Sequence, residues 1–234
     1  FYLESTRVQT ARAALSQSLR RKEAMAASAY DVARVPSLEA NVRQQCADGT
    51  YDLDNNLALL KLYQFHPEKS DSAVVGRVLV KALTRLPASD YLMCTYLIPE
   101  RVQEEELLAQ VAAVAALLET CQFRGVWAAL EPLQEPLLQH IPGVADALRD
   151  FVVHTLGLTY QAIPAAHVTA SLGLDAAAAA KLVEARGWRV EGELVQVALN
   201  DDNQAKPRKA AEEGGGALQL GQLTKVMSAA FGLH

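Results

Sequence analysis

The fold is decided by residues 164–197, which read PAAHVTASLGLDAAAAAKLVEARGWRVEGELVQV. Their first half predicts two short helices, because Gly173 breaks the apolar pattern and Asp175 can cap the alanine-rich segment that follows. Their second half predicts two strands, over residues 188–190 and 194–197, joined by a tight glycine turn. A helix-turn-helix followed by a hairpin is typical of a winged helix.

The charge of this region argues against nucleic-acid binding. Residues 164–199 carry three basic and four acidic side chains. Affinity for DNA comes from cations that neutralise phosphates, and a helix made mostly of alanine offers no donors to base edges. Direct duplex binding is therefore disfavoured, although folding could still assemble a basic face from Arg and Lys residues that are distant in sequence.

The chain before this region consists of short apolar segments of helical period, separated by Pro, Ser and Asp. The predicted helices cover residues 38–45, 53–65, 73–86, 91–98, 102–118 and 123–130. Helix pairs of this length bury a core only by stacking on their neighbours, which favours a HEAT/TPR-like repeat domain. No exact repeat period is visible, so an irregular helical bundle is the alternative.

The expected fold class is mainly α, with a helical repeat domain, a winged-helix domain with a small β-hairpin wing, and a C-terminal helix. The domains expected are the helical repeat over 1–141, the winged helix over 142–199, a flexible linker over 200–216 and the C-terminal helix over 217–234. The linker is predicted from its mixed charges, its proline and its three glycines. Residues 142–156 should form an apolar helix, and residues 158–163 a short strand.

The C-terminal helix carries an apolar stripe at helical spacing, made of Leu220, Leu223, Met227 and Phe231. A helix of this length is marginal alone in water, so the stripe needs a partner. We hypothesise that these four residues contact another protein. No further site residue is predicted.

Composition fits an ordinary globular protein of 234 residues with 50% hydrophobic residues and a formal charge of −5. No window approaches the roughly 18 apolar residues of a membrane span. The isolated cysteines Cys46, Cys94 and Cys121 indicate a reducing compartment, and each is expected to be buried. The five histidines form no HExxH or His-Asp-Ser arrangement. We therefore predict no enzyme, no cofactor and no metal.

Residues 7–22 carry five Arg and Lys residues and no acid. This is the composition of an organellar transit peptide. The apolar residues Val8, Ala11, Leu15 and Leu19 fall on one helical face, however, so an amphipathic first helix explains the same residues and is the preferred interpretation.

Four segments resemble the subunit K family of eukaryotic translation initiation factor 3. They are YDLDNNLALLKLYQFHP at residues 51–67, LVKALTRLP at 79–87, LLETCQFRGVWAAL at 117–130 and FVVHTLGLTYQAI at 151–163. The resemblance runs over residues 51–188 and fades at both ends. Helical repeats followed by a winged helix also resemble the PCI architecture shared by the proteasome lid, the COP9 signalosome and initiation factor 3.

The resemblance implies a noncatalytic scaffold subunit that acts in translation initiation on the small (40S) ribosomal subunit, in the cytoplasm. It implies other initiation factor 3 subunits as partners, with subunit l as the nearest neighbour and subunits c and e in the same region. The alternatives are a proteasome lid or COP9 signalosome subunit of the same architecture, and a winged-helix nucleic-acid-binding protein.

Overall fold

The computed structural model describes residues 31–204. The basic segment at residues 7–22 lies outside the described residues. So does the predicted C-terminal helix with its stripe of Leu220, Leu223, Met227 and Phe231. The chain divides into two compact units, residues 1–198 and residues 199–234.

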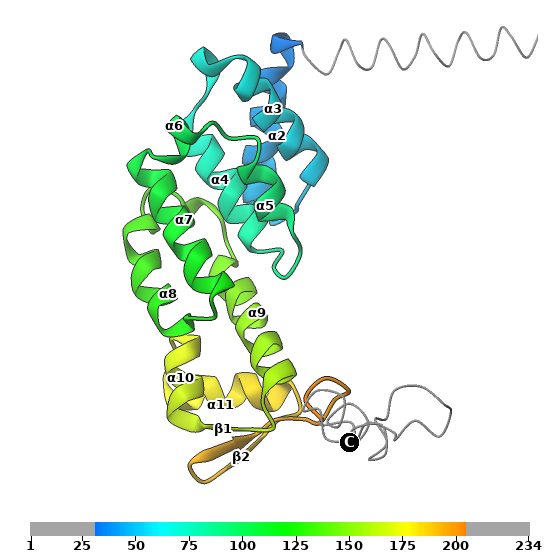
Figure 1. Ribbon diagram of the computed structural model, residues 1–234, viewed down its shortest axis with the longest axis vertical. Coiled ribbons are helices and arrows are strands. Elements are labelled where there is room, and N and C mark those ends of the chain that lie inside the picture. Colours follow the sequence, from blue (N-terminus) through cyan, green and yellow to red (C-terminus); the bar gives the residue numbers. More distant parts are fainter. Residues whose placement is uncertain (1–30, 205–234) are drawn as a thin grey trace, which may run out of the picture. The chain divides into compact units, whose positions relative to one another are not determined.

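The described part of the first unit is mainly helical, with a small sheet near its C-terminal end (Figure 1). Its α-helices are α2 (Val35–Asp48), α3 (Leu53–Phe65), α4 (Ser72–Leu83), α5 (Asp90–Thr95), α6 (Glu100–Gln103), α7 (Glu106–Glu119), α8 (Phe123–Leu130), α9 (Val144–Thr159), α10 (Ala165–Leu172) and α11 (Ala176–Ala185). Its strands are β1 (Ala162–Pro164), β2 (Arg189–Glu191) and β3 (Leu194–Gln196). Short 3-10 turns are η1 (Val32–Arg34), η2 (Pro67–Lys69), η3 (Glu131–Leu133) and η4 (Leu138–His140).

Helices that are close in sequence pack on one another through the whole unit. Helix α2 contacts α3 and α4, α4 contacts α5 and α7, and α7 contacts α8. Helix α8 then contacts α10, which packs on α11. The mainly helical fold with a winged helix at its end is confirmed. The predicted limits of the domains stay predictions.

Helix α3 forms as the sequence predicts, over Leu53–Phe65. The backbone N–H of Asn55 donates to the Asp52 carboxylate at 3.0 Å, so Asp52 is the N-cap. Helix α4 begins in the same way, because the Asp71 carboxylate accepts a hydrogen bond from Ala73 N at 2.8 Å. In both helices a short acidic side chain satisfies amides that have no partner inside the helix.

Two predicted elements are corrected by the structure. The helix expected over residues 102–118 is split into α6 and α7, because Glu105 leaves the helical path and its carboxylate accepts from the Ser72 hydroxyl. The strand expected over residues 158–163 begins only at Ala162. Helix α9 continues to Thr159, whose hydroxyl donates to the Thr155 carbonyl at 2.9 Å.

The sheet has the strand order β1-β3-β2, and both pairs are antiparallel. Val195 in the central strand lies opposite Ile163 on one side and Val190 on the other. Directly opposite residues point to the same face, so these three side chains share a face. Val195 and Ile163 are buried, whereas Val190 is 40% exposed. The predicted hairpin wing is confirmed.

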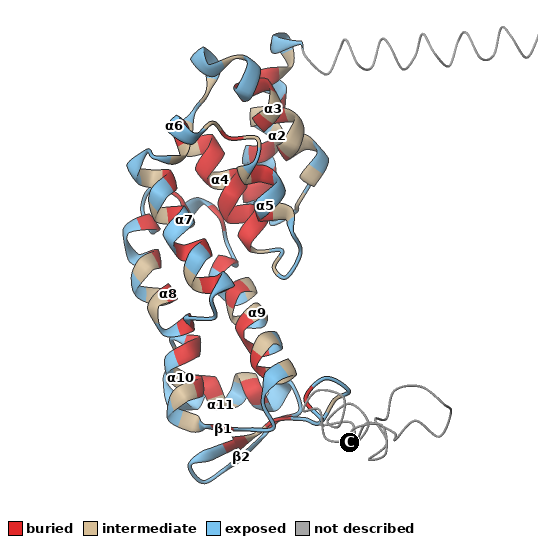
Figure 2. Ribbon diagram, viewed as in Figure 1, coloured by how far each residue is buried: buried red, intermediate tan, exposed pale blue. Residues whose placement is uncertain are grey.

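The hydrophobic core extends along the unit, and α4 is buried over most of its length (Figure 2). A polar cluster lies within it. The side-chain amides of Gln45 and Asn56 exchange hydrogen bonds at 3.0 and 3.3 Å. Lys81 Nζ donates to the main-chain carbonyl of Gln45 at 3.1 Å. Burial lowers the pKa of Lys81. Buried polar groups are tolerated when they find partners in this way.

The expectation that all three cysteines are buried is wrong for Cys121, which is exposed. Cys121 ends the turn after α7 with φ of 57°, the left-handed conformation. The next residue, Gln122, donates its N–H to the Leu117 carbonyl at 2.8 Å. This is the Schellman arrangement that ends many helices and usually contains glycine, and it leaves the Cys121 side chain outside the core.

In the second unit, the described residues 199–204 form a turn. The Asn200 side chain accepts hydrogen bonds from the backbone N–H groups of Asp202 and Asn203, both at 2.9 Å. Considering residues 31–204 only, no helix is both long enough and apolar enough to cross a membrane.

Candidate protein-contact surfaces

The winged helix offers little positive charge to a nucleic acid. Helix α11, its second helix, begins at the Asp175 cap, which accepts from Ala178 N at 2.8 Å. At the other end of α11, the Arg186 guanidinium pairs with the Asp150 carboxylate of α9. One of the three cations in this region is therefore already matched by a carboxylate. This arrangement suits contact with protein better than contact with phosphates.

Trp127 of α8 joins the helical part of the unit to the winged helix. Its indole Nε1–H donates to the Ser171 carbonyl at 2.9 Å, at the end of α10. Gly173 follows with φ of 59°, and a Cβ atom there would lie 2.6 Å from the Trp127 ring. Only glycine satisfies both the left-handed backbone and the close approach of the indole. The turn at Gly173 is predicted from the sequence, whereas its contact with Trp127 is not, because the two residues are distant in sequence.

Arg149 of α9 completes this junction. Its guanidinium Cζ lies 4.9 Å from the centre of the Trp127 ring, within cation–π range. Its Nε–H donates to the Leu172 carbonyl at 3.2 Å, and its Nη1 pairs with Asp146 at 3.0 Å. Trp127 and Arg149 thus donate hydrogen bonds to the last two backbone carbonyls of α10. These carbonyls accept no hydrogen bond inside the helix. They fix the orientation of the helix-turn-helix on α8 and α9.

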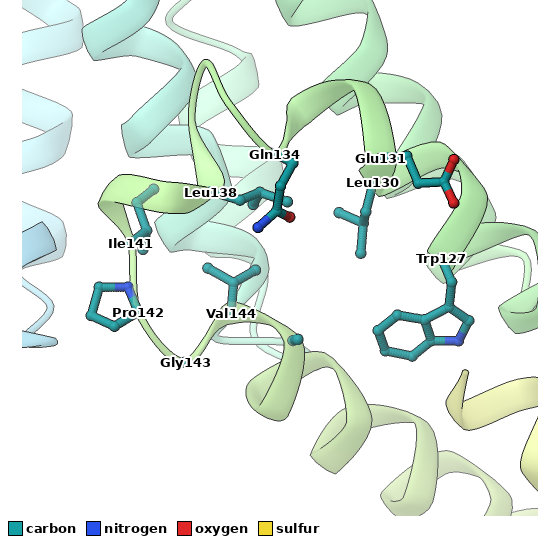
Figure 3. A pocket seen from close by; sticks show the side chains of 10 residues that line it. Trp127, Leu130, Glu131, Gln134, Leu138, Ile141, Pro142, Gly143 and Val144 are labelled. Carbon is teal, nitrogen blue, oxygen red and sulfur yellow. The ribbon is translucent and has the colours of Figure 1, made fainter. Parts of the chain in front are cut away.

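A pocket of about 490 Å³ opens beside this junction (Figure 3). Figure 3 shows Leu130, Leu138 and Val144 around it, with Trp127 at one end and Pro142 at the other. Its lining is mostly apolar, so it could take an apolar side chain of a partner. Glu131 is the one titratable residue in this lining, so the pocket does not bring together a group of titratable side chains.

A second apolar surface lies between α5 and α7. Leu92, Met93 and Tyr96 are 48%, 38% and 76% exposed. Leu92 and Tyr96 line a groove of about 370 Å³ whose other wall is formed by alanines of α7. Large apolar side chains gathered at one place on a surface commonly mark a protein contact. The sequence pattern does not reveal this surface, because α5 is too short to bury all of its apolar residues and only the structure shows where it ends.

The described residues contain no arrangement that indicates catalysis. Within residues 31–204, no group of three or more His, Cys, Asp or Glu side chains is placed to hold a metal ion. His66 lies 3.4 Å from the Glu68 carboxylate, and His167 lies against Arg124. His154, within an apolar run of sequence, is exposed on α9. These histidines are separate from one another and form no catalytic group.

The part of the chain that contains the junction and the winged helix matches a known protein family. The model of the CSN8/PSMD8/EIF3K family matches residues 69–209. The chain belongs to the CSN8/PSMD8/EIF3K family. The match begins before α4 and extends past β3, so it includes the junction at Trp127 and the whole winged helix.

Within the CSN8/PSMD8/EIF3K family, the chain is similar to several proteins named eukaryotic translation initiation factor 3 subunit K. The subunit K of Bombyx mori is 37% identical over 175 residues, which are 74% of this chain and 80% of that protein. The Nematostella vectensis subunit is 33% identical over 185 residues, covering 79% and 85% of the two chains. The human subunit is 41% identical over 134 residues, covering 57% and 61%. The resemblance found in the sequence is thereby confirmed.

Proposed function

We propose that this protein is a noncatalytic scaffold subunit of the eukaryotic translation initiation factor 3 complex, acting in translation initiation on the small (40S) ribosomal subunit. The observation that carries the proposal is the identity of 33 to 37% with subunit K proteins over most of both chains. In this proposal the protein acts through contacts with other proteins, in the cytoplasm, and uses no cofactor.

The surfaces of the first unit support a contact function. Its described residues 31–198 carry 21 acidic and 13 basic side chains, so most of this body repels nucleic acid. The apolar groove between α5 and α7 and the partly exposed wing residues Val190 and Leu194 are chemically suited to protein neighbours. A scaffold needs such surfaces on a rigid body, and the Trp127 junction provides rigidity between the helical repeats and the winged helix.

The proposed partners are other subunits of the same complex. Subunit l is the proposed nearest neighbour, with subunits c and e in the same region. We also propose that the stripe of Leu220, Leu223, Met227 and Phe231 contacts one of them, because apolar residues at helical spacing in so short a segment require a partner.

A proteasome lid or COP9 signalosome subunit is the alternative, because the family name covers all three groups. The similarity to subunit K proteins over about four fifths of their length favours initiation factor 3. A winged-helix nucleic-acid-binding protein is the second alternative, and the excess of acidic residues argues against it.

The deciding experiment is affinity purification of the tagged chain from its own cells at moderate salt, followed by mass spectrometry. We expect other initiation factor 3 subunits together with the small ribosomal subunit. Recovery of proteasome or signalosome subunits would instead keep the architecture and overturn the proposed complex. Recovery of nucleic acid without these proteins would support the second alternative.

The stripe is tested in the same purification by replacing Leu220, Leu223, Met227 and Phe231 with Ser. We expect the recovery of neighbouring subunits to fall, because the apolar face is lost. A matched control replaces Gln219, Gln222, Thr224 and Ala229 of the same segment with Ser and should leave recovery unchanged. Full incorporation of the stripe variant would show that the stripe makes no essential contact.

A further inference from the structure

A second pocket, at the base of the winged helix, brings together an arginine and a histidine. It has a volume of about 490 Å³ and lies between α8, the end of α9, β1 and α10. Arg124 of α8 and His167 of α10 lie at this pocket, and Ile163, Pro164 and Tyr160 contribute apolar surface. Ile163 is 1% exposed, so this part of the lining is fixed in the core.

The contact between the two polar side chains determines which hydrogen-bonding groups they can offer. Arg124 Nη2 lies 2.6 Å from His167 Nδ1. A guanidinium can only donate, so Nδ1 must accept, and the neutral ring then carries its proton on Nε2. Arg124 retains N–H groups that His167 does not use, and His167 retains its Nε2–H. The pair therefore offers several donors and one positive charge.

Two other arginines of this unit each form an ion pair with a carboxylate, whereas Arg124 does not. Arg149 pairs with Asp146, and Arg186 pairs with Asp150. Arg124, by contrast, has no carboxylate within 4.0 Å among residues 31–204, although acidic side chains outnumber basic ones there. A guanidinium held by an uncharged imidazole keeps its full charge available to an incoming anion.

We propose that the Arg124–His167 pocket receives the carboxylate of an Asp or Glu side chain from a neighbouring protein subunit. This inference rests on the proposed function, in that the neighbour is a member of the same complex. The guanidinium fork of Arg124 matches a carboxylate in geometry, and His167 Nε2–H supplies a further donor. The apolar surface of Ile163, Pro164 and Tyr160 accommodates an apolar residue beside the acid.

The charge of the surroundings favours a single carboxylate over RNA as the ligand of this pocket. Each phosphate of a nucleic acid is followed by the next one along the backbone, so stable binding needs several cations in a row. This pocket provides one arginine in a unit whose described residues 31–198 carry 21 acidic and 13 basic side chains. Arginine is also enriched among the residues that contribute most to protein interfaces, where the surrounding contacts exclude water from it.

The test uses the full chain within its native complex and the variant R124K. Lysine keeps the positive charge and adds an amine, which a carbodiimide joins to a carboxylate only when the two groups are in direct contact. We expect an amide cross-link from the introduced lysine to an Asp or Glu of another subunit, identified by mass spectrometry. The matched control is R101K, at the exposed Arg101 of α6, which should give no such cross-link.

A second variant measures the contribution to binding. R124E replaces the attraction by repulsion, so recovery of the cross-linked subunit should fall on the order of tenfold in a wash at moderate salt, where charges are not fully screened, equivalent to about 1.4 kcal/mol. R101E should leave recovery unchanged. Circular dichroism of each purified variant verifies that the fold is retained, which is expected because Arg124 is exposed.

Several outcomes would overturn the proposal. They are an intact complex without the R124K cross-link, a cross-link only to acids of this chain, and RNA joined to this region by ultraviolet light in place of a protein neighbour. The purification of the unmodified chain tests the proposed function separately. Recovery in a different complex, with the cross-link present, would reject initiation factor 3 and keep the carboxylate pocket. Recovery without any partner would reject both.

Discussion

At the scale of single residues, Gly173 has the most constrained environment in the junction. Its backbone is left-handed, and the Trp127 ring occupies the space of its missing side chain. Gly187 is also left-handed, with φ of 78°, but nothing lies within 4 Å of the place where its Cβ would be. The two glycines therefore separate the cost of backbone conformation from the cost of a steric clash.

We expect Gly173→Ala to lower the free energy of unfolding by roughly 2–4 kcal/mol, because left-handed strain and a displaced indole add together. Gly187→Ala should cost only about 1 kcal/mol, from the backbone alone. Urea unfolding followed by circular dichroism measures both. Equal losses in the two variants would show that the Trp127 contact does not constrain residue 173.

Lys81 gives a prediction about pH. Burial is the main cause of its lowered pKa, and the charge of Arg85 acts in the same direction. The unfolded chain therefore holds more protons than the folded one between the lowered pKa and the ordinary value near 10.4. The contribution of Lys81 to the free energy of unfolding therefore rises with pH between these two pKa values. Below the lowered pKa, the folded protein bears the full cost of burying the charged lysine.

Lys81→Met removes this cost, so its stability relative to the protein that keeps Lys81 should be highest near neutral pH and should decrease as the pH rises. Urea unfolding at several pH values between about 7 and 10 measures the difference. Both proteins carry Cys46→Ala, because the Cys46 thiol and Lys81 influence each other's pKa and the thiol would otherwise titrate differently in the two. The exposed Lys69→Met is the control and should show no such trend; a flat profile for both variants would contradict the prediction.

At the scale of elements, the sequence predicts best where a helix contains its own start and stop. Helix α3 has Asp52 as cap and Pro67 after its end, and its bounds were predicted correctly. The break between α6 and α7 was missed because it depends on Ser72, which is distant in sequence and binds Glu105. The junction contacts of Trp127 and the pairing of Arg124 with His167 were missed for the same reason, since each joins separate helices.

The cap of α3 is open to a direct test. Asp52→Ala leaves the Asn55 N–H without its partner and should lower the free energy of unfolding by about 1 kcal/mol. Asp54→Ala, in the first turn of the same helix, loses only an interaction with the helix dipole and should cost roughly 0.3 kcal/mol. Thermal unfolding of both variants provides the comparison, and a larger loss for Asp54→Ala would contradict the assignment of the cap.

At the scale of the whole molecule, charge is distributed unevenly along the chain. Residues 31–204 have 23 acidic and 13 basic side chains, whereas residues 1–30 have two acidic and five basic ones. This asymmetry follows from composition alone. Residues 1–30 should attract nucleic acid, and residues 31–204 should repel it.

We expect the purified full chain to bind single-stranded RNA weakly, with a Kd no tighter than about 10⁻⁵ M at physiological salt, and any affinity to fall steeply as salt is raised. Deleting residues 1–30 should remove most of it, because the remaining chain is more acidic. Fluorescence anisotropy with a labelled oligonucleotide measures both proteins. Binding that survives the deletion would come from a basic face of residues 31–204 or from residues 205–234, which carry four basic and two acidic side chains.

The left-handed turn after α7 makes this chain convenient for spectroscopy. Cys46 and Cys94 are buried, and burial raises the pKa of both thiols, that of Cys94 to about 12 with the charge of Asp90 contributing. Both will therefore react slowly with maleimides, which require the thiolate. Cys121 is accessible without any mutation. A single dye or spin label at this position would report distances from the turn between α7 and α8 to any neighbour in an assembled particle.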